Sequence, residues 1–161
     1  MKPVTVIIET PKGSAEKFNY EPEFKAFKLS KIMPAGMVFP YDFGFVPDTK
    51  GEDGDPLDIL VLSEFKTFPG CMMDCRLIGG IAAKQTEKDG ETVRNDRFIA
   101  VPAVSHQYEK VNSIEDLPEK LPEEIEHFFR TYNHLSGKVF EPVERLNAEK
   151  AYKMIKHNQH G

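Results

Sequence analysis

Residues 51–62, GEDGDPLDILVL, join an acidic loop directly to an apolar run. Asp53, Asp55 and Asp58 are crowded together at the point where the apolar run begins. Carboxylates crowded in this way repel one another and raise one another's pKa unless a cation lies among them. Mg²⁺ binds proteins through a few carboxylates, waters and substrate phosphates. The loop therefore predicts a hard divalent cation at the rim of a buried strand.

The loop also has a defined shape. Gly54 permits a sharp backbone path, and Pro56 biases Asp55 toward an extended conformation, which fixes where this carboxylate points. On composition alone the alternative is a solvated acidic turn, the commonest form of segments rich in Asp, Gly and Pro. A calcium-binding EF-hand is excluded because its D-x-D-x-D-G pattern is absent.

Strands are predicted on both sides of this loop, through the first 105 residues. β-branched and apolar runs separated by Gly, Pro and charged residues are typical of strands. The predicted strands are residues 5–10, 17–21, 24–29, 37–46, 57–62, 72–84 and 98–104. The paired glycines at 79–80 predict a bend of the long strand at a barrel corner.

The last third of the chain changes to a helical period. The motif 113–116 marks a helix start, and an apolar helix face follows. This face consists of Ile125, Phe128, Phe129 and Tyr132, at i, i+3, i+4 and i+7. Gly137 is the expected stop, and Asn147 the expected cap of a final helix to about residue 156. The pattern predicts an α+β fold, a small barrel with two C-terminal helices packed outside.

Length and charge restrict the function. A chain of 161 residues has room for one sizeable core, so we expect a single domain over residues 1–161. The net charge of −5 argues against nucleic acid, because binding to its backbone depends on Lys and Arg. We expect no membrane partner, because no apolar run approaches about 18 residues. The first 13 residues lack a signal-peptide cleavage site, so a cytoplasmic location is expected.

Cysteine and histidine give no catalytic pattern. Cys71 and Cys75 lack a C-x-x-C motif and are expected to be buried core thiols. Ser105 and His106 have no acidic partner that the sequence identifies. The histidines form no zinc hydrolase motif. They are His106, His127, His134, His157 and His160.

The segment DGDPLDI, residues 53–59, resembles the signature of the family I soluble inorganic pyrophosphatases. Other segments are similar to that family in the same order: VIIETP, Tyr20-Glu21, MVFPYDFGFVP, FIAVP, IEHFFxxY and NAE. The resemblance covers about residues 4 to 156. It implies an OB-like five-stranded β-barrel and hydrolysis of inorganic pyrophosphate, a small phosphate substrate, to two phosphates. It also implies Mg²⁺, with Mn²⁺ as a substitute, and a homo-oligomer, either a trimer or a hexamer.

The resemblance implies a role for each matching acid. Asp53 and Asp58 look like ligands of a first pair of metals, and Asp55 looks like the base that accepts a proton from the attacking water. Glu9 and Glu21 look like support for further metals. This division agrees with the chemistry, because neutral water is a poor nucleophile and both phosphates need charge relief.

The resemblance is weaker where the family is rich in Lys, Arg and Tyr. Asn19 and Asn133 stand in lysine positions, while Phe39 and Phe43 replace tyrosines and are expected to form an apolar wall. Lys17 shares a strand face with Asn19, so its ammonium is expected to reach toward the missing one. The residues expected to bind substrate are Lys17, Asn19, Lys31, Phe43, Arg97, Tyr132 and Asn133.

A second acidic cluster is also altered. Counting back from FIAVP, Asn95 falls where the resemblance expects a metal-binding Asp. Asp96 is expected to point to the opposite face, by strand alternation. Glu87 is the expected stand-in for an earlier Asp, with Asp89 as its competitor, so Glu87 and Asn95 join the candidate metal ligands.

Two other functions remain open. One is hydrolysis of a related organic diphosphate by the same fold, which the changes at Asn19, Asn95 and Asn133 favour. The other is a low-activity or inactive homologue that only binds phosphate. The three aspartates of the loop argue against the latter, because they retain the metal and base chemistry that hydrolysis needs.

Overall fold

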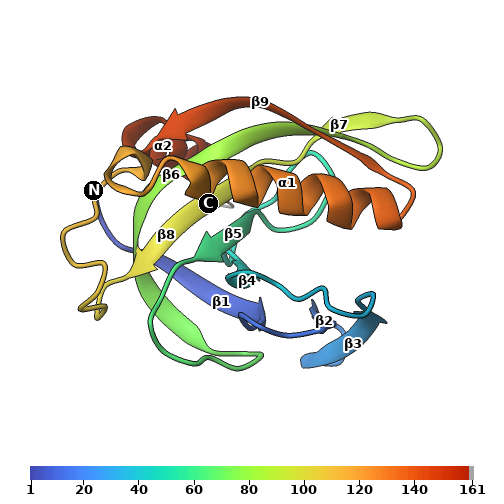
Figure 1. Ribbon diagram of the computed structural model, residues 1–161, viewed down its shortest axis with the longest axis horizontal. Helices are drawn as coiled ribbons and strands as arrows, with labels where there is room; N and C mark the ends of the chain where they lie inside the picture. Colours follow the sequence, from blue (N-terminus) through green and yellow to red (C-terminus); the bar gives the residue numbers. More distant parts are fainter. Residues whose placement is uncertain (160–161) are drawn as a thin grey trace.

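Five strands pair in a ring in the computed structural model, which describes residues 1–159 (Figure 1). The ring consists of β1 (Val4–Thr10), β4 (Asp42–Phe45), β5 (Asp58–Val61), β8 (Arg97–Pro102) and β6 (Met72–Thr86). Each strand pairs with the next, and β6 pairs with β1 as well. The β5–β8 pair is parallel and the other pairs are antiparallel. The predicted α+β fold with a five-stranded, barrel-like arrangement is confirmed.

The long strand β6 bends at the predicted glycines. Its pairing with β8 shifts register between Leu77 and Gly79. A Cβ at Gly79 would lie 2.5 Å from the carbonyl oxygen of Leu146 and 2.6 Å from a methyl carbon of Ile114. Position 79 therefore requires a glycine, because any side chain there would collide with Leu146 and Ile114.

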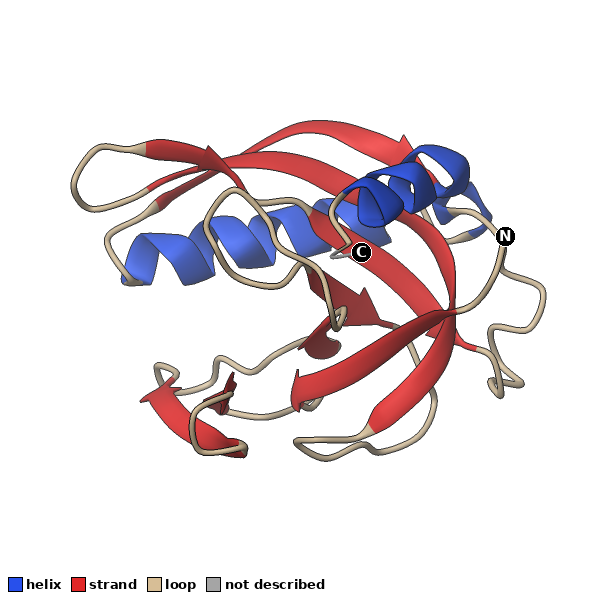
Figure 2. Ribbon diagram, turned by 180° about the vertical axis from the view of Figure 1, so that it is seen from behind, coloured by secondary structure: helices blue, strands red, loops and turns tan. Residues whose placement is uncertain are grey.

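A two-stranded hairpin forms its own sheet beside β1 of the ring. It consists of β2 (Glu16–Glu21) and β3 (Ala26–Ile32), close to the predicted segments. Figures 1 and 2 both show this hairpin across from the helix α1 (Lys120–Leu135). The hairpin carries Lys17, Asn19 and Lys31, so three of the expected substrate-binding residues come from one element.

Two α-helices pack outside the ring within residues 1–159. The first, α1, follows a short 3-10 turn, η1 (Ile114–Asp116), and buries Ile125 and Phe129. The second, α2 (Ala148–His157), begins at Asn147, whose side-chain oxygen accepts a hydrogen bond from Lys150 N at 2.8 Å. The predicted cap is therefore present.

One strand contradicts the predicted order of elements. The prediction of strands followed by two helices is wrong, because β9 (Val139–Asn147) lies between α1 and α2 and pairs with β6. Its hydrophobic signal is weak, since only Phe140 and Leu146 are buried along it. In the described part of the chain it pairs with β6 alone, and such an edge strand tolerates Pro142.

Smaller differences concern the ends of elements. A short strand, β7 (Thr92–Arg94), was not expected, and the predicted strand 37–46 is shortened to β4.

Of the two cysteines, Cys75 is buried as expected, whereas Cys71 is only half-buried. None of the helices formed by residues 1–159 has the length and apolar character needed to cross a membrane. His160 and the predicted domain end at residue 161 lie outside the described residues.

Candidate active site

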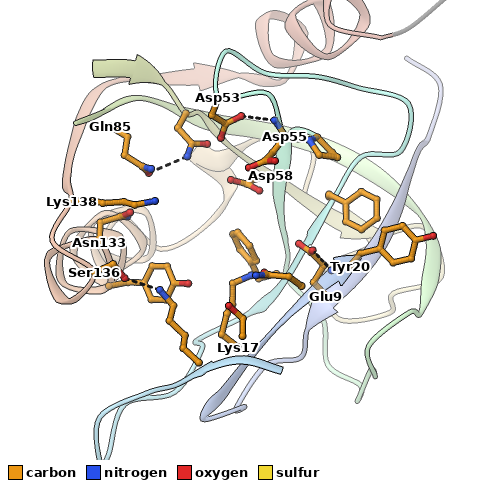
Figure 3. A pocket seen from close by; sticks show the side chains of 18 of the residues that line it. Glu9, Lys17, Tyr20, Asp53, Asp55, Asp58, Gln85, Asn133, Ser136 and Lys138 are labelled. Atoms are coloured by element: carbon orange, nitrogen blue, oxygen red, sulfur yellow. Dashed lines mark hydrogen bonds between the residues drawn. The ribbon is translucent and has the colours of Figure 1, made fainter. Parts of the chain in front are cut away.

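A cavity of about 600 Å³ lies between the ring, the hairpin and the end of α1 (Figure 3). It brings together the fourteen residues that the sequence singled out, although they are spread over more than 120 positions. These are Glu9, Lys17, Asn19, Glu21, Lys31, Phe43, Asp53, Asp55, Asp58, Glu87, Asn95, Arg97, Tyr132 and Asn133. The shared cavity establishes that they are neighbours, and the role of each stays a prediction.

The aspartate loop forms one wall of this cavity. Asp55 N donates a hydrogen bond to the Asp53 carboxylate at 3.0 Å, and Gly51 N donates to Asp55 O at 2.8 Å. Gly54 has a φ of +87°, which glycine adopts without strain. Burial raises the pKa of Asp53 to about 6, whereas the Asp55 side chain is exposed. The loop thus presents one half-buried and one accessible carboxylate.

Asp58, at the start of β5, is placed differently. It lies opposite Arg97 in the parallel β5–β8 register, and the Arg97 guanidinium contacts its carboxylate at 2.7 Å. Burial raises the pKa of Asp58, and the charge of Arg97 opposes that shift. Arg97 is 3% exposed and also donates to the side-chain oxygen of Asn95. Asp58 therefore faces the cavity already paired with a cation.

Glu9 and Lys17 form the wall below the loop (Figure 3). The Glu9 carboxylate accepts a hydrogen bond from Tyr20 N at 2.8 Å. Burial raises the pKa of Glu9 and lowers the pKa of Lys17, and each charge opposes the other's shift. Lys17 is 6% exposed, with its ammonium 4.5 Å from the ring centre of Phe43. The ammonium of Lys17 is therefore part of the cavity wall. It lies on the side where Asn19 stands in a lysine position.

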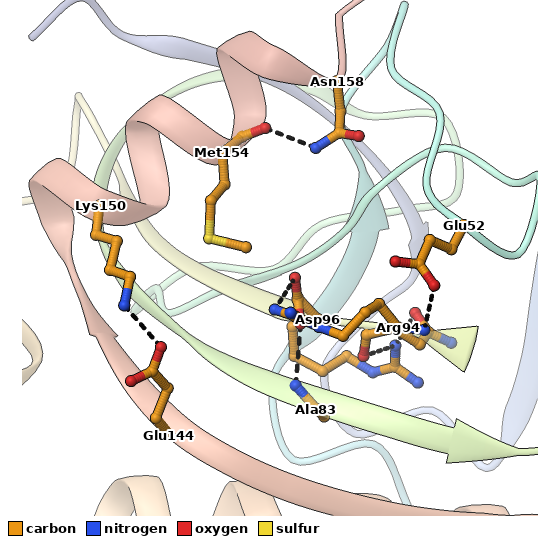
Figure 4. A network of polar contacts seen from close by, with 10 residues as sticks. Glu52, Ala83, Arg94, Asp96, Glu144, Lys150, Met154 and Asn158 are labelled. Atoms are coloured by element: carbon orange, nitrogen blue, oxygen red, sulfur yellow. Dashed lines mark hydrogen bonds and ion pairs between the residues drawn. The ribbon is translucent and has the colours of Figure 1, made fainter. Parts of the chain in front are cut away.

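The second acidic cluster is divided between two faces. Glu87 lines the cavity and pairs with Lys138 at 3.0 Å, whereas Asp89 accepts a hydrogen bond from Glu91 N in an exposed turn. Asp96 points away from the cavity, where it accepts hydrogen bonds from Ala83 N and Arg94 (Figure 4). Strand alternation thus separates Asp96 from Asn95, as expected.

Lys31, Tyr132 and Asn133, three of the predicted substrate contacts, already make contacts within the chain. The Lys31 ammonium donates to Ser136 Oγ at 2.7 Å and lies 4.2 Å from the ring centre of Tyr132. The side-chain amide of Asn133 donates to Phe129 O at 2.8 Å, within its own helix. The amide nitrogen of Asn133 is therefore already bonded within α1.

The expected apolar wall is largely absent. Phe39 is fully buried, packs against Phe43, Phe128 and Tyr132, and does not line the cavity. Phe43 lines it with 5% exposure, beneath the ammonium of Lys17. Packing against α1 buries these rings.

Gln85, Ser136 and Lys138 line the cavity and were missed by the sequence analysis. Gln85 is the next-to-last residue of β6 and lies two positions before Glu87, so strand alternation continued past the end of β6 would have placed both on one face. Ser136 ends α1 and Lys138 follows it, but no motif in the sequence points to either residue. These residues close the side of the cavity between β6 and α1.

Comparison with known proteins agrees with the earlier resemblance. A family model described as inorganic pyrophosphatase matches residues 6–160. The chain belongs to the inorganic pyrophosphatase family. It is 39% identical to the Thermus thermophilus inorganic pyrophosphatase over 135 residues, 84% of this chain and 74% of that protein. It is 38% identical to the Halalkalibacterium halodurans inorganic pyrophosphatase over 154 residues, 96% of this chain and 91% of that protein.

Solved pyrophosphatase structures have the same fold. The crystal structure of the Thermus thermophilus inorganic pyrophosphatase superposes with a TM-score of 0.89 at 32% identity, covering 98% of this chain and 89% of that one. An inorganic pyrophosphatase from Coxiella burnetii gives a TM-score of 0.87 at 32% identity, covering 98% and 93%. The OB-like pyrophosphatase fold is therefore confirmed.

Membership of the pyrophosphatase family implies a divalent metal ion and a small phosphate substrate. Within residues 1–159, however, no group of three or more Asp, Glu, His or Cys side chains is arranged to hold a metal. Asp53 and Asp55 fit a hard cation by donor type. The opposite wall does not fit, because Asn95 is neutral and Glu87 is paired with Lys138.

Proposed function

We propose that the chain hydrolyses inorganic pyrophosphate to two phosphates, with Mg²⁺ or, in its place, Mn²⁺. The observation that carries the proposal is the exposed Asp55 carboxylate at a cavity whose other walls hold Lys17 and Lys31. The Asp55 carboxylate thus faces the ammonium groups of Lys17 and Lys31 across a cavity large enough to hold pyrophosphate. Membership of the inorganic pyrophosphatase family supports the same reaction.

The residues of this chain have complementary parts in the reaction. Lys17 and Lys31 attract the anion and orient its phosphates, while Asp55 accepts the proton of the attacking water. A divalent ion, when bound, would acidify that water and relieve the charge of the phosphates. Asp53 is the proposed ligand in the loop, with Glu9 and Glu21 as support from β1 and β2.

Asp58, Asn95 and Glu87 have less support as metal ligands. Asp58 and Asn95 are bonded to Arg97, and Glu87 is bonded to Lys138. Each would have to exchange an existing partner for the metal. Tyr132 and Arg97 remain proposed contacts at the substrate end, although Arg97 faces Asp58 in this structure.

The two alternative functions have weaker support. An organic diphosphate would need an apolar surface beside the phosphates, but Lys17 covers Phe43 and Phe39 is buried. A protein that only binds phosphate has no need of the Asp55 base. Pyrophosphate therefore remains the proposed substrate.

The test is a phosphate-release assay of the full chain with Mg²⁺ and with Mn²⁺. Pyrophosphate, nucleoside triphosphates and nucleotide sugars are compared, with Asp55→Asn as the control for contaminating activity. We expect the highest kcat/KM for pyrophosphate. A higher kcat/KM for a nucleotide sugar would favour the organic diphosphate, and release from none of them would favour the inactive homologue.

Three further expectations belong to this proposal. They are a single domain over residues 1–161, a homo-oligomer of three or six copies, and a cytoplasmic location. Light scattering of the purified chain tests the second, since a trimer has three times and a hexamer six times the mass of 18.3 kDa. Cell fractionation tests the third.

A further inference from the structure

The Arg97 guanidinium lies at the centre of a set of side-chain oxygens. Its Nη1 atom donates to Asp58 at 2.7 Å, to the Asn95 backbone oxygen at 3.2 Å and to the Asn95 side-chain oxygen. Its Nη2 atom lies 3.5 Å from the Gln85 side-chain oxygen, which also accepts from the Asn95 amide at 3.0 Å. Asp58, Asn95 and Gln85 thus converge on one cation that the chain itself supplies.

Aromatic rings hold this cation in place. The guanidinium carbon lies 4.6 Å from the ring centre of Phe129 and 5.4 Å from that of Phe140. Rings at such distances attract a guanidinium through their negative faces. With 4% of its side chain exposed, Arg97 cannot readily turn out to solvent.

The charges around Arg97 are already balanced. The three side-chain groups that converge on it carry one negative charge in total, on Asp58, because Asn95 and Gln85 are neutral. A guanidinium keeps its positive charge at any pH that a protein tolerates. A divalent ion on the same carboxylate, at about 2.1 Å from its oxygen, would meet an adjacent positive charge in a buried place.

We propose that Arg97 takes the place of a divalent metal ion on the Asp58 side of the cavity. It binds Asp58, Asn95 and Gln85 as a permanent cation. Any metal then binds on the side of Asp53 and Asp55, without Asp58 as a ligand. The inference rests on metal use by the site, as proposed above, but not on the identity of the substrate.

The test counts the Mn²⁺ ions bound by the full chain without substrate, by calorimetry and by electron paramagnetic resonance of free Mn²⁺. The main variant is Asn95→Asp with Arg97→Lys, which adds a carboxylate and withdraws the guanidinium fork. We expect this double variant to bind one more Mn²⁺ than the wild type. The gain should vanish when Asp58→Asn is added.

Asp58→Asn in the otherwise wild-type chain should leave the number of bound Mn²⁺ ions unchanged. The matched control is Arg94→Met, which removes an arginine that pairs with Asp96 outside the cavity and should also leave the number unchanged. Circular dichroism establishes that each variant is folded.

Two results overturn the inference. Asp58→Asn alone lowers the number of bound Mn²⁺ ions by one, or the double variant binds no more ions than the wild type. Neither result depends on catalysis. The proposed function fails by a different measurement, namely if the wild-type chain releases no phosphate from pyrophosphate.

Discussion

The two polar walls of the cavity differ in how their charges are balanced. In the loop of residues 51–57, Asp55 is exposed and Asp53 is bonded to a backbone amide, so this wall keeps negative charge for a ligand. In the strands around residues 85–97, Arg97 and Lys138 occupy the available oxygens. The difference supports the proposals that the first wall carries the metal ligand and the base, and that the chain's own cations neutralise the second wall.

The largest expected effect lies in the stability of the second wall. Arg97→Met removes the partner of a largely buried carboxylate, and breaking such a pair costs about 3–5 kcal/mol. We expect urea denaturation without metal to show this loss in the free energy of unfolding. Lys138→Met is the control, because its pair with Glu87 is partly exposed and should contribute less than about 1 kcal/mol. Equal losses would remove the contrast between the two pairs.

The first wall is tested by its exposed base. Asp55→Asn keeps the shape of the side chain but cannot accept the proton, so turnover of pyrophosphate should fall about 100-fold or more. Initial rates of phosphate release at saturating Mg²⁺ measure this effect. Asp89→Asn, in an exposed turn outside the cavity, should keep the wild-type rate. A fully active Asp55→Asn would place the base elsewhere.

The next effect concerns Lys17, the cation in the wall below the aspartate loop. Lys17→Met removes the ammonium that lies over Phe43, and the loss of a charged contact is worth roughly 1.5–3 kcal/mol. The kcat/KM for pyrophosphate should therefore fall roughly 10- to 100-fold. Lys28→Met is matched to it, since Lys28 is exposed on the neighbouring strand opposite Asn19. If both variants lose equally, Lys17 contributes only through the overall charge.

The smallest expected effect sharpens the account of the second wall. Asn95→Asp alone leaves Arg97 in place, and the guanidinium should take up the added carboxylate. The Mg²⁺ concentration for half-maximal activity should then change less than about threefold, because the adjacent guanidinium offsets the added charge. A tenfold or larger decrease would mean that residue 95 contacts the metal directly.

Much of the site was predictable because its residues are tied to local patterns. The spacing of Asp53, Asp55 and Asp58 and the alternation that separates Asn95 from Asp96 are properties of a few consecutive residues. The partners of those residues are not. Asp58 meets Arg97 only because β5 and β8 are parallel in one register, and 39 positions separate them in sequence.

The same distinction explains what was missed in the fold. Both helices have an apolar face and α2 has the Asn147 cap, so their approximate positions followed from the sequence. The start of α1 did not, because it begins at Lys120 without a side-chain cap and the motif 113–116 forms η1. The strand β9 carries three charged residues and Pro142 among its nine positions, buries only Phe140 and Leu146, and is held by its pairing with β6. Similarly, the side-chain amide of Asn133 donates to Phe129 O within α1. This orientation depends on packing and does not follow from the spacing of residues in the sequence.

The bent strand β6 has a consequence for synthesis of the protein. Four strands pair along it, and they come from residues as early as Val4 and as late as Asn147. A nascent chain that stops before residue 139 leaves the backbone of residues 79–86 without the partner that β9 supplies. An unpaired edge of this kind invites association with other chains. Since distant pairings form slowly, the ribosome must deliver nearly the whole chain before this edge is protected.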